Sequence, residues 1–436
     1  MTIPFRQPQF PAAPAVPSQA ARRMAAARTA QEGWAQRPLR ERLRVVRSLR
    51  HGIAERAGEL ARAAHGGRPE AEVLSSQIVP LADACRFLER EACRILATRR
   101  LGSEGRPAWL AGVESEVRRE PLGLVLVIAP SNYPLFLPGV QTLQALAAGN
   151  AVLWKPGRDG SAAAEAFAGL ARAAGLPDGL LGLLPEEPEA AREAIALGVD
   201  KVLLTGSAAT GREVLAQLAS HLTPSTMELS GCDAVFVLPG ADLDRAARAI
   251  RFGTELNGGA TCIAPRRVFV PRELDEGWKA RLAPAGIDLF PVANTGEALR
   301  EAARGPYALG AAIFGPEDEA RALAGRVRAG VVVINDVIVP TADPRLPFGG
   351  RGESGYGVTR GAEGLLELTV PKVVAVRTSR RPPHLEEPHP GDADLFRAYL
   401  TLAHGGGWRR RLRGAAALLR ALARRGRTSR QEGRRA

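Results

Sequence analysis

The feature that most constrains the fold of this chain is an alternation of short apolar runs with helix-like segments between residues 122 and 207. Four runs end in Pro, Gly or Ser: LGLVLVIAP (122–130), NAVLWKP (150–156), GLLGLLP (179–185) and KVLLTGS (201–207). The segments between them, such as PGVQTLQALAAG and SAAAEAFAGLARAAG, have the spacing of helices with one apolar face. Short buried strands that alternate with helices are typical of a parallel, doubly wound sheet. The sequence therefore predicts an α/β fold.

Parallel sheets bind ligands at the carboxyl ends of their strands, so the residues that follow each run are candidate site residues. Asn132, Lys155 and the Thr205-Gly206-Ser207 turn occupy such positions. In TGSAATGRE (205–213) a strand ends where a helix begins, and the positive end of that helix would face an anion. GRGESG (350–355) also matches a dinucleotide fingerprint, but neither a strand before it nor a helix directly after it is indicated.

The net charge of +13 is concentrated in one part of the chain. From Arg377 to Ala436 there are fifteen Arg and five acidic residues, a balance of +10, which leaves only +3 for the rest. A nearly balanced body argues against a broad basic face, so we expect no specific nucleic-acid partner. Within the basic part, WRRRLRGAAALLRALARRGR (408–427) has the pattern of a basic amphipathic helix that could contact a membrane surface; a solvated Arg-rich tail is the alternative.

The cysteines and histidines of the sequence indicate which cellular compartment and which kinds of metal site to expect. The four cysteines form no CxxC pair and have no disulfide-like spacing, which fits a reducing compartment. The six histidines are scattered, and the sequence suggests no metal site. No signal-like pattern or bilayer-length apolar run is present, so we expect a cytoplasmic protein, at most peripheral at the inner membrane face.

The stretch NGGATCIAPRR (257–267) places Cys262 among small and flexible residues. A free cysteine is usually a small core residue. A thiolate is also a good nucleophile, and glycines permit close approach of another molecule to it. The residues around Cys262 alone leave both interpretations open.

Seven stretches in a fixed order decide between them. They are REPLGLVLVIAPSNYP (119–134), GNAVLWKP (149–156), VLLTGS (202–207), HLTPSTMELSG (221–231), NGGATCIAPRRVFV (257–270), INDVIVP (334–340) and LPFGGRGESGYG (346–357). Together they resemble the aldehyde dehydrogenase superfamily, most closely its class 3, fatty-aldehyde-oxidising branch. The resemblance implies a doubly wound cofactor domain, an α/β catalytic domain and a small oligomerisation sheet.

The resemblance also implies an activity, namely NAD(P)-dependent oxidation of an aldehyde to a carboxylic acid through a cysteine thiohemiacetal and thioester. Cys262 matches the nucleophile, and Asn132 matches the donor that, with the backbone N–H of Cys262, holds the oxyanion. Glu228, 34 residues before Cys262 in the sequence, matches the general base that activates water. These three residues form the predicted catalytic set.

Cofactor residues are implied in the same way. Lys155 matches a lysine that bonds the adenosine ribose, while Gly206 and Ser207 match positions near the pyrophosphate. Where the family usually has a glutamate after the lysine, this chain has Arg158. Because a carboxylate repels a 2′-phosphate and an arginine attracts one, we predict that NADP is accepted as well as NAD.

The resemblance also implies one pair of residues near the nicotinamide ribose of the cofactor and another pair near the substrate. Asp288 and Phe290 are aligned with a motif that anchors the nicotinamide ribose, and Asn335 and Phe348 with positions at the substrate end. The separation of 73 residues between Cys262 and Asn335 is shorter than the resemblance implies. We therefore expect a shortened catalytic domain that limits activity or opens the site.

The predicted domain boundaries follow from these matches. They are 20–229 for the cofactor-binding domain, 106–120 for its part of the oligomerisation sheet, 230–357 for the catalytic domain (shortened near 271–290), 358–376 for the oligomerisation strand and 377–436 for the basic tail. We expect a homodimer and a small aldehyde substrate, long-chain or aromatic. Two alternatives stay open: an acyl-CoA or acyl-phosphate reductase, which would not need Glu228, and an inactive relative that acts as a binding or scaffold subunit.

Overall fold

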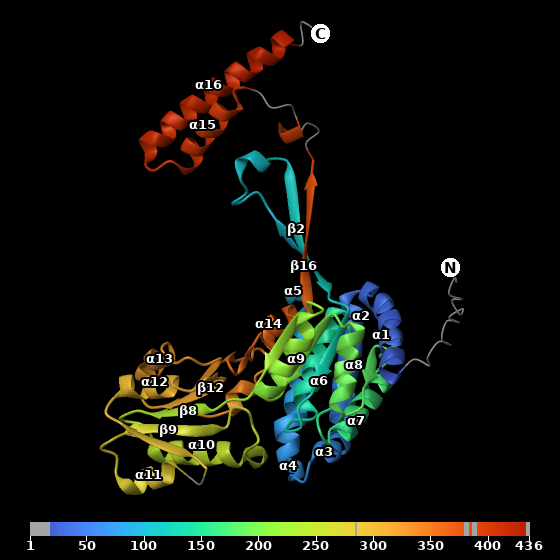
Figure 1. Cartoon of the computed structure of the whole chain (residues 1–436), viewed down its shortest axis with the longest axis vertical. Helices are drawn as coiled ribbons and strands as arrows, with labels where there is room; N and C mark the ends of the chain where they lie inside the picture. Colours follow the sequence, from blue (N-terminus) through green and yellow to red (C-terminus); the bar gives the residue numbers. More distant parts are fainter. Residues whose placement is uncertain (1–17, 284–285, 379–382, 386–389, 433–436) are drawn as a thin grey trace, which may run out of the picture. The chain divides into compact units, whose positions relative to one another are not determined.

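The computed structural model describes residues 18–283, 286–378, 383–385 and 390–432. The chain divides into two compact units (Figure 1). The first unit contains residues up to 99 and residues 117–373, and the second contains residues 100–116 and the chain from 374 onward. All the predicted catalytic, cofactor and substrate residues belong to the first unit.

A six-stranded sheet forms the larger half of the first unit, with strand order β15-β7-β6-β3-β4-β5. The bounds are β3 (Leu124–Ile128), β4 (Ala151–Lys155), β5 (Leu181–Leu183), β6 (Lys201–Thr205), β7 (Ser225–Glu228) and β15 (Gly355–Tyr356). Strands β3 to β7 pair in parallel, and β15 adds an antiparallel edge. The predicted parallel, doubly wound sheet is confirmed.

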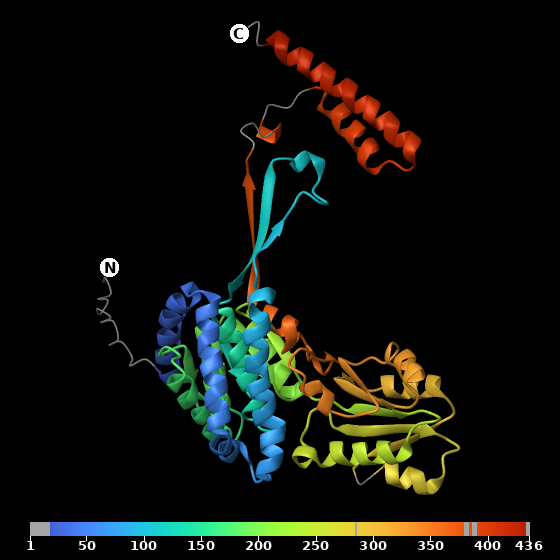
Figure 2. The same ribbon diagram turned by 180° about the vertical axis from the view of Figure 1, so that it is seen from behind.

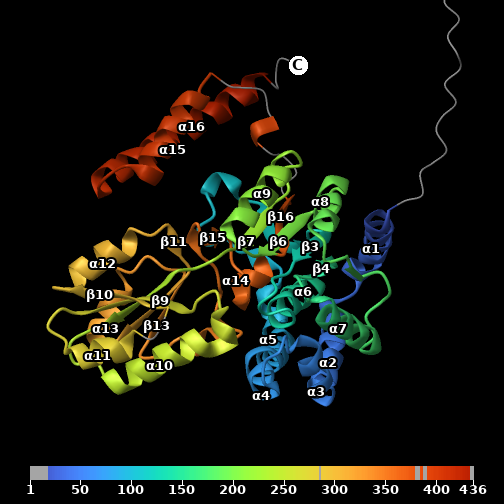
Figure 3. The ribbon, with the colours of Figure 1, turned by 60° about the horizontal axis from the view of Figure 1, so that its bottom comes forward.

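Helices cover both faces of this sheet (Figure 3). Helices α8 and α9 lie on one side of the strands, α6 and α7 lie on the other, and α2 and α5 form a further layer, which faces the viewer in Figure 2. The bounds are α1 (Gln19–Gln36), α2 (Leu39–Glu55), α3 (Ala57–Ala64), α4 (Glu70–Val73), a π-helical turn (Leu74–Ile78), α5 (Val79–Ile95), α6 (Phe136–Ala148), α7 (Ser161–Ala173), α8 (Pro188–Leu197) and α9 (Ala208–Ala219). A βαβ crossover places helices on both faces, which is why these strands are apolar throughout.

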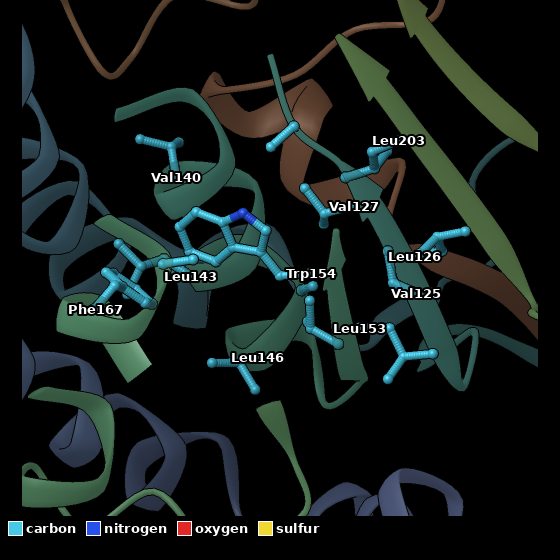
Figure 4. Packing of buried hydrophobic residues seen from close by; sticks show 14 of the residues in the cluster. Val125, Leu126, Val127, Val140, Leu143, Leu146, Leu153, Trp154, Phe167 and Leu203 are labelled. Atoms are coloured by element: carbon cyan, nitrogen blue, oxygen red, sulfur yellow. The ribbon is translucent and has the colours of Figure 1, made fainter. Parts of the chain in front are cut away.

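The core between the sheet and α6 shows that burial directly (Figure 4). Residues of β3, β4 and α6 are fully or almost fully buried, and Trp154 packs on Phe167 of α7 with ring centroids 5.4 Å apart. Each buried aromatic or aliphatic side chain contributes about 1.5–3 kcal/mol of transfer free energy. This rigid core fixes the strand ends from which the candidate site residues project.

A second sheet of five parallel strands forms the other half of the first unit, in the order β10-β9-β8-β12-β13. Its elements are β8 (Asp233–Val237), α10 (Leu243–Glu255), β9 (Pro265–Pro271), α11 (Glu276–Leu282), β10 (Asp288–Val292), α12 (Thr295–Ala303), β12 (Gly310–Phe314), α13 (Glu317–Ala324) and β13 (Val331–Ile334). Separate apolar clusters cover its two faces. The segment predicted to be shortened, 271–290, holds α11 and the start of β10.

Two small sheets complete the strands. β1 (Arg99–Leu101), β2 (Val113–Pro121) and β16 (Thr369–Arg377) form a three-stranded sheet in that order, and β11 (Tyr307–Ala308) pairs with β14 (Arg351–Gly352). The two segments predicted for an oligomerisation sheet, 106–120 and 358–376, thus contribute neighbouring strands to one sheet. Short helical segments occur at Ala108–Leu110, Leu256–Gly259, Val339–Ala342, α14 (Gly361–Leu366) and Pro383–Leu385.

Most of the second unit is an antiparallel pair of helices, α15 (Asp392–His404) and α16 (Trp408–Glu432). The predicted basic helix 408–427 lies within α16. Gly414 permits close packing, because a Cβ atom there would lie 2.5 Å from the backbone nitrogen of Leu402. No helix in the described part of the chain has the length and apolar character needed to cross a bilayer. Residues 379–382, 386–389 and 433–436 of the predicted tail lie outside the described residues.

Candidate active site

The candidate active site is built where loops after β3 and β7 meet the loop that carries Cys262. That loop follows α10 and a short 3₁₀ helix, and its backbone at Asn257, Gly258 and Gly259 has φ values of 57°, 59° and 75°. Three consecutive left-handed residues reverse the chain sharply, a conformation that asparagine and glycine adopt most readily. The flexible approach predicted for Cys262 is therefore a specific tight turn.

Asn132 contacts this turn directly. Its side-chain Nδ2 donates to the carbonyl oxygen of Ala260 at 2.7 Å, two residues before Cys262. Tyr133, the next residue, is buried, and its hydroxyl lies 2.7 Å from Oγ1 of Thr261. Each of the two residues that precede Cys262 is thus bonded to the loop after β3. The nucleophile loop and Asn132 form one connected structure.

A second set of contacts reaches this loop from the connection between α3 and α4. Arg68 donates to the carbonyl oxygen of Asn132 at 3.1 Å and to Oδ1 of Asn257. Glu72 accepts from the backbone N–H of Asn257 at 2.9 Å, and Nδ2 of Asn257 donates to the carbonyl oxygen of Asn132 at 3.0 Å. The segment HGGRP (65–69) between α3 and α4 thus supplies the arginine that ties the loop to Asn132.

Glu228 ends β7 and is almost completely buried, with 4% of its surface exposed. Oε1 accepts from the hydroxyl of Thr359, and Oε2 accepts from that of Thr205 at 3.4 Å. Burial raises the pKa of this carboxyl, while the Thr359 hydroxyl, the Arg360 guanidinium and the Thr205 hydroxyl lower it. A carboxylate whose pKa is raised in this way is suited to accept a proton near neutral pH.

Cys262 is partly buried beside the carboxyl groups of two residues. The pKa of its thiol is raised to about 12, first by burial and then by Glu228 and Asp233, while Arg360 and the backbone amide of Cys262 oppose the rise. The sulfur is thus close enough to Glu228 for the two groups to affect each other's ionisation. In this state the thiol is neutral at physiological pH, so nucleophilic attack requires that it lose its proton.

The cofactor-binding candidates line a cleft of about 280 Å³ at the carboxyl ends of β3, β4 and β6. Lys155, Arg158 and Gly206 are in its wall. Burial lowers the pKa of Lys155, and Glu186, Glu187 and Glu189 act in the opposite direction. Ser207 caps α9, and its Oγ accepts from the backbone N–H of Thr210 at 3.1 Å.

These residues fit a dinucleotide. The cleft lies at the strand ends where α/β sheets bind nucleotides, and it is bordered by the amino end of α9 and by cationic side chains. Lys155 would hold ribose hydroxyls, and the Gly206–Ser207 turn would receive the pyrophosphate. Arg192 of α8 also lines the cleft; nothing in the sequence pattern separated it from the other surface arginines.

Asp288 and Phe290 are not brought to this cleft. Both lie on β10, an edge strand of the five-stranded sheet, where Phe290 stacks on Phe269 with centroids 5.0 Å apart and packs into an apolar cluster. Asp288 is exposed at the start of the strand. Their match to a nicotinamide-ribose motif gains no support here, because Phe290 packs into an apolar cluster and Asp288 lies exposed on an edge strand.

The two predicted substrate residues differ in their surroundings. The side-chain amide of Asn335 forms two hydrogen bonds with the backbone of Gly315. Oδ1 accepts from the N–H and Nδ2 donates to the carbonyl oxygen, both at 3.0 Å, so this side chain joins the ends of β12 and β13. Phe348 is buried in a small cluster with Ile263 and Leu309, against which Cys262 packs. Of the pair, Phe348 is the one next to the thiol.

Three residues of the site had no distinguishing sequence signal. Thr359 bonds Glu228, Arg360 acts on both Glu228 and Cys262, and Asp233 lies near Cys262 with its pKa raised by burial to about 7. Thr205, which also bonds Glu228, was a candidate because of its position at the end of a predicted strand. Thr359 and Arg360 are more than 90 residues from Cys262 in the sequence and reach it only through the fold.

Comparison with known proteins identifies relatives of this chain and structures with the same fold. A protein named 4,4'-diapolycopene aldehyde oxidase from Methylomonas sp is 28% identical, with 85% of this chain and 84% of that protein aligned. The NADP-dependent glyceraldehyde-3-phosphate dehydrogenase of Bacillus halodurans, solved with NADP, has the same fold with a TM-score of 0.77 at 23% identity, covering 83% of this chain and 92% of that one. A Mycobacterium tuberculosis aldehyde dehydrogenase solved with NAD+ gives 0.76 at 23% identity, covering 83% and 91%.

The model of the aldehyde dehydrogenase family matches residues 8–286 and 287–374. That match covers most of the chain and includes every residue of the candidate site. The chain therefore belongs to the aldehyde dehydrogenase family, whose enzymes use NAD or NADP, as the seven ordered motifs predicted.

Proposed function

We propose that this protein oxidises an aldehyde to a carboxylic acid through a covalent intermediate on Cys262. The sulfur attacks the carbonyl carbon, and the carbonyl oxygen takes the negative charge of the thiohemiacetal. Asn132 and the backbone N–H of Cys262 are the proposed donors to that oxygen. NAD or NADP, when bound, accepts the hydride from the carbon. Water activated by Glu228 then releases the acid from the thioester.

The contacts around Asn132, Cys262 and Glu228 support this proposal. Asn132 bonds the turn that leads to Cys262, and the ionisation of Cys262 depends on Glu228. A buried glutamate beside the thiol favours hydrolysis of an acyl intermediate over transfer to coenzyme A or phosphate.

The direct test is reduction of NAD(P) by the purified protein with long-chain and aromatic aldehydes, followed by absorbance. Cys262→Ala should lower the rate to background, since it removes the bond-forming atom, while Cys93→Ala, at an exposed cysteine of α5, should not. Glu228→Gln should slow hydrolysis and accumulate an acyl adduct on Cys262, detectable by mass spectrometry. Full activity in Cys262→Ala would refute the proposal.

We infer further that NADP is a good cofactor, and that it is preferred. Arg158 and Arg192 both line the cleft, and both are exposed, so either can approach a 2′-phosphate. Charge-assisted hydrogen bonds of this kind are each worth about 1.5–3 kcal/mol, or roughly 10- to 100-fold in affinity. Arg158→Glu should raise the KM for NADP by such a factor and leave that for NAD within a few fold. Arg172→Glu, on the exposed part of α7, is the charge-matched control.

We also propose a substrate class and a branch of the family for this protein. The cluster beside Cys262 is apolar, with Phe348, Ile263 and Leu309 buried in it, which suits a long-chain or aromatic aldehyde and is consistent with the class 3 branch.

We also propose a cytoplasmic homodimer joined through the sheet of β2 and β16. β16 supports this, because Val370, Val373 and Val376 are exposed along it and such a strand is normally covered.

We propose membrane contact for the second unit on a separate observation. Trp408, Leu412, Leu419 and Leu422 are exposed on α16 at spacings of one helical face. The side chain buried between the helices, Ala398, is small. Large apolar groups therefore lie outside this helical pair, and the groove of about 420 Å³ between its helices is lined by arginines. Exposed apolar side chains beside arginines match the surface of an anionic bilayer.

A further inference from the structure

Arg360 is a buried cation that the proposed mechanism does not yet use. It precedes α14, and only 6% of its surface is exposed. Its Nη1 donates to the carbonyl oxygen of Thr341 at 2.6 Å, but Nε is buried and has no hydrogen-bond partner in the described structure. A buried charge that is only partly hydrogen-bonded is costly, so other interactions must compensate it.

Aromatic rings supply part of that compensation and fix the position of the charge. Cζ of Arg360 lies 4.5 Å from the centroid of the Phe348 ring and 5.9 Å from that of Phe136. A cation over a ring face is attracted by the electrons of the ring. Phe348 belongs to the cluster against which Cys262 packs, so the guanidinium lies on a ring of the nucleophile's own surroundings.

The backbone of Arg360 is held in a conformation that side chains avoid. Its φ of 61° and ψ of 174° fall in a region that is essentially reserved for glycine. The preceding residue is fixed on both sides: Thr359 and Phe348 exchange two backbone hydrogen bonds of 2.8 Å, and the Thr359 hydroxyl donates to Glu228. Strain of this kind persists only where the surroundings impose it, and it is concentrated at functional sites.

We propose that Arg360 is a positioning residue whose guanidinium is a shared counter-charge, used in turn by the Cys262 sulfur and the Glu228 carboxylate. This inference rests on the proposed function for the roles of those two groups. The charged or titratable groups that act on the Cys262 thiol are Glu228, Asp233 and Arg360, and Tyr133 lies near it as well. Among them Arg360 is the one cation.

Because Arg360 carries a single positive charge, it stabilises either the Cys262 thiolate or the Glu228 carboxylate much better than it stabilises both at once. When sulfur attacks, its proton passes to solvent water, the C–S bond forms and the carbonyl electron pair moves to oxygen. After hydride has left, the thioester sulfur carries no charge, and the cation then favours the ionised Glu228. The carboxylate takes a proton from water, the hydroxyl group bonds to the acyl carbon, and the C–S electron pair returns to sulfur. The negative charge beside Arg360 thus moves between the two groups.

The test measures the alkylation of Cys262 by iodoacetamide as a function of pH, in the absence of aldehyde, with the modified peptide quantified by mass spectrometry. Because the thiolate reacts, loss of the counter-charge lowers the rate at a given pH. Arg360→Met should react at least about tenfold more slowly than the wild type, which corresponds to one pKa unit. Arg360→Lys, which keeps the charge, should recover to within about threefold of the wild type.

Arg42→Met is the matched control. Arg42 is also buried, at 8% exposed, and bonds only backbone carbonyl groups near α6. It should lower thermal stability without changing the alkylation profile of Cys262. Superimposable profiles for Arg360→Met and the wild type, with circular dichroism unchanged, would overturn the proposal.

If Arg360→Met does not fold, Glu228→Gln provides a second test of whether Cys262 and Glu228 share the charge of Arg360, because this variant retains the arginine. With the carboxylate neutralised, the cation acts on sulfur alone, and alkylation should be at least about tenfold faster at the same pH. An unchanged rate would refute the shared counter-charge. Because no substrate is turned over, these outcomes are distinct from a failure to oxidise aldehydes.

Discussion

At the scale of single residues, the site depends on what surrounds its two acids. Glu228 and Asp233 are both buried and both have a raised pKa, but Glu228 has two hydroxyl partners and Asp233 has one oxygen without a partner. Hydrogen bonds to a carboxylate favour its charged form. The hydroxyl partners of Glu228 therefore oppose the effect of burial, whereas for Asp233 that opposition comes from the N–H of Gly310 and from Arg267 and Arg266.

Replacing Thr359 with valine removes one of the donors to Glu228. The pKa of Glu228, already raised by burial, should rise further, by about one unit if the bond is worth 1.4 kcal/mol. The acidic limb of the pH profile of kcat/KM should then move to higher pH, with activity recovering as the pH increases. Thr359→Ser, which keeps the hydroxyl, should retain the wild-type limb. Identical limbs for the valine variant and the wild type would show that this bond does not tune the base.

Asp233 should make the protein less stable as the pH rises. Its folded-state pKa of about 7 lies above the value near 3.9 of an unfolded chain, so the folded state binds more protons between these values and stability falls across that interval. Asp233→Asn removes this titration and keeps an oxygen that can accept from the N–H of Gly310. Thermal unfolding at several pH values should show that the free energy of unfolding of the variant, relative to that of the wild type, increases from about pH 4 to pH 7, by up to roughly 4 kcal/mol. A difference that is constant with pH would contradict this.

At the scale of elements, the catalytic loop is held by parts of the chain that are far apart in sequence. The strand ends of β3, β4, β5 and β6 could be predicted, because apolar runs that end in Pro, Gly or Ser mark them and parallel strands align their carboxyl ends. Arg360 could not, because it is a surface-type residue in sequence and becomes buried only when its segment pairs with Phe348. Asp288 and Phe290 were matched by a short motif alone, and in the structure they lie on an edge strand and are not among the residues that line the cofactor cleft.

Arg68 is the clearest case of an element-scale contact, since it joins the α3–α4 connection to both Asn132 and Asn257. Arg68→Met should leave these two groups without their charged donor, at a cost of about 1.5–3 kcal/mol in the free energy of unfolding. The nucleophile turn should also become less ordered, so kcat should fall by roughly ten- to 100-fold, as for misplaced reacting groups. Arg62→Met, at an exposed position of α3, is the control. Loss of stability with unchanged kcat would mean that Arg68 supports the fold but not the site.

At the scale of the whole molecule, chemistry and charge are carried by different units. The first unit contains the complete candidate site, and most of the net charge falls in the C-terminal residues of the second unit, +10 of +13 by the sequence. A polypeptide that only needed to stay in solution would have no reason to expose four large apolar residues on a basic helix. Together these properties favour a catalytic body with a separate surface for a partner.

The expected partner is an anionic bilayer, and the apolar stripe of α16 allows this to be tested in the full-length chain. Wild-type protein should float with vesicles that contain phosphatidylglycerol and not with vesicles of phosphatidylcholine alone, and added salt should weaken the binding because it screens the arginines. Changing Leu412, Leu419 and Leu422 together to serine removes about 1.5–3 kcal/mol of apolar transfer energy per side chain and should abolish flotation. Leu222→Ser, at a leucine of the first unit that is 90% exposed, should not. If the triple variant floats as well as the wild type, arginine charge alone accounts for binding; if neither floats, α16 serves another partner, such as a second copy of this chain.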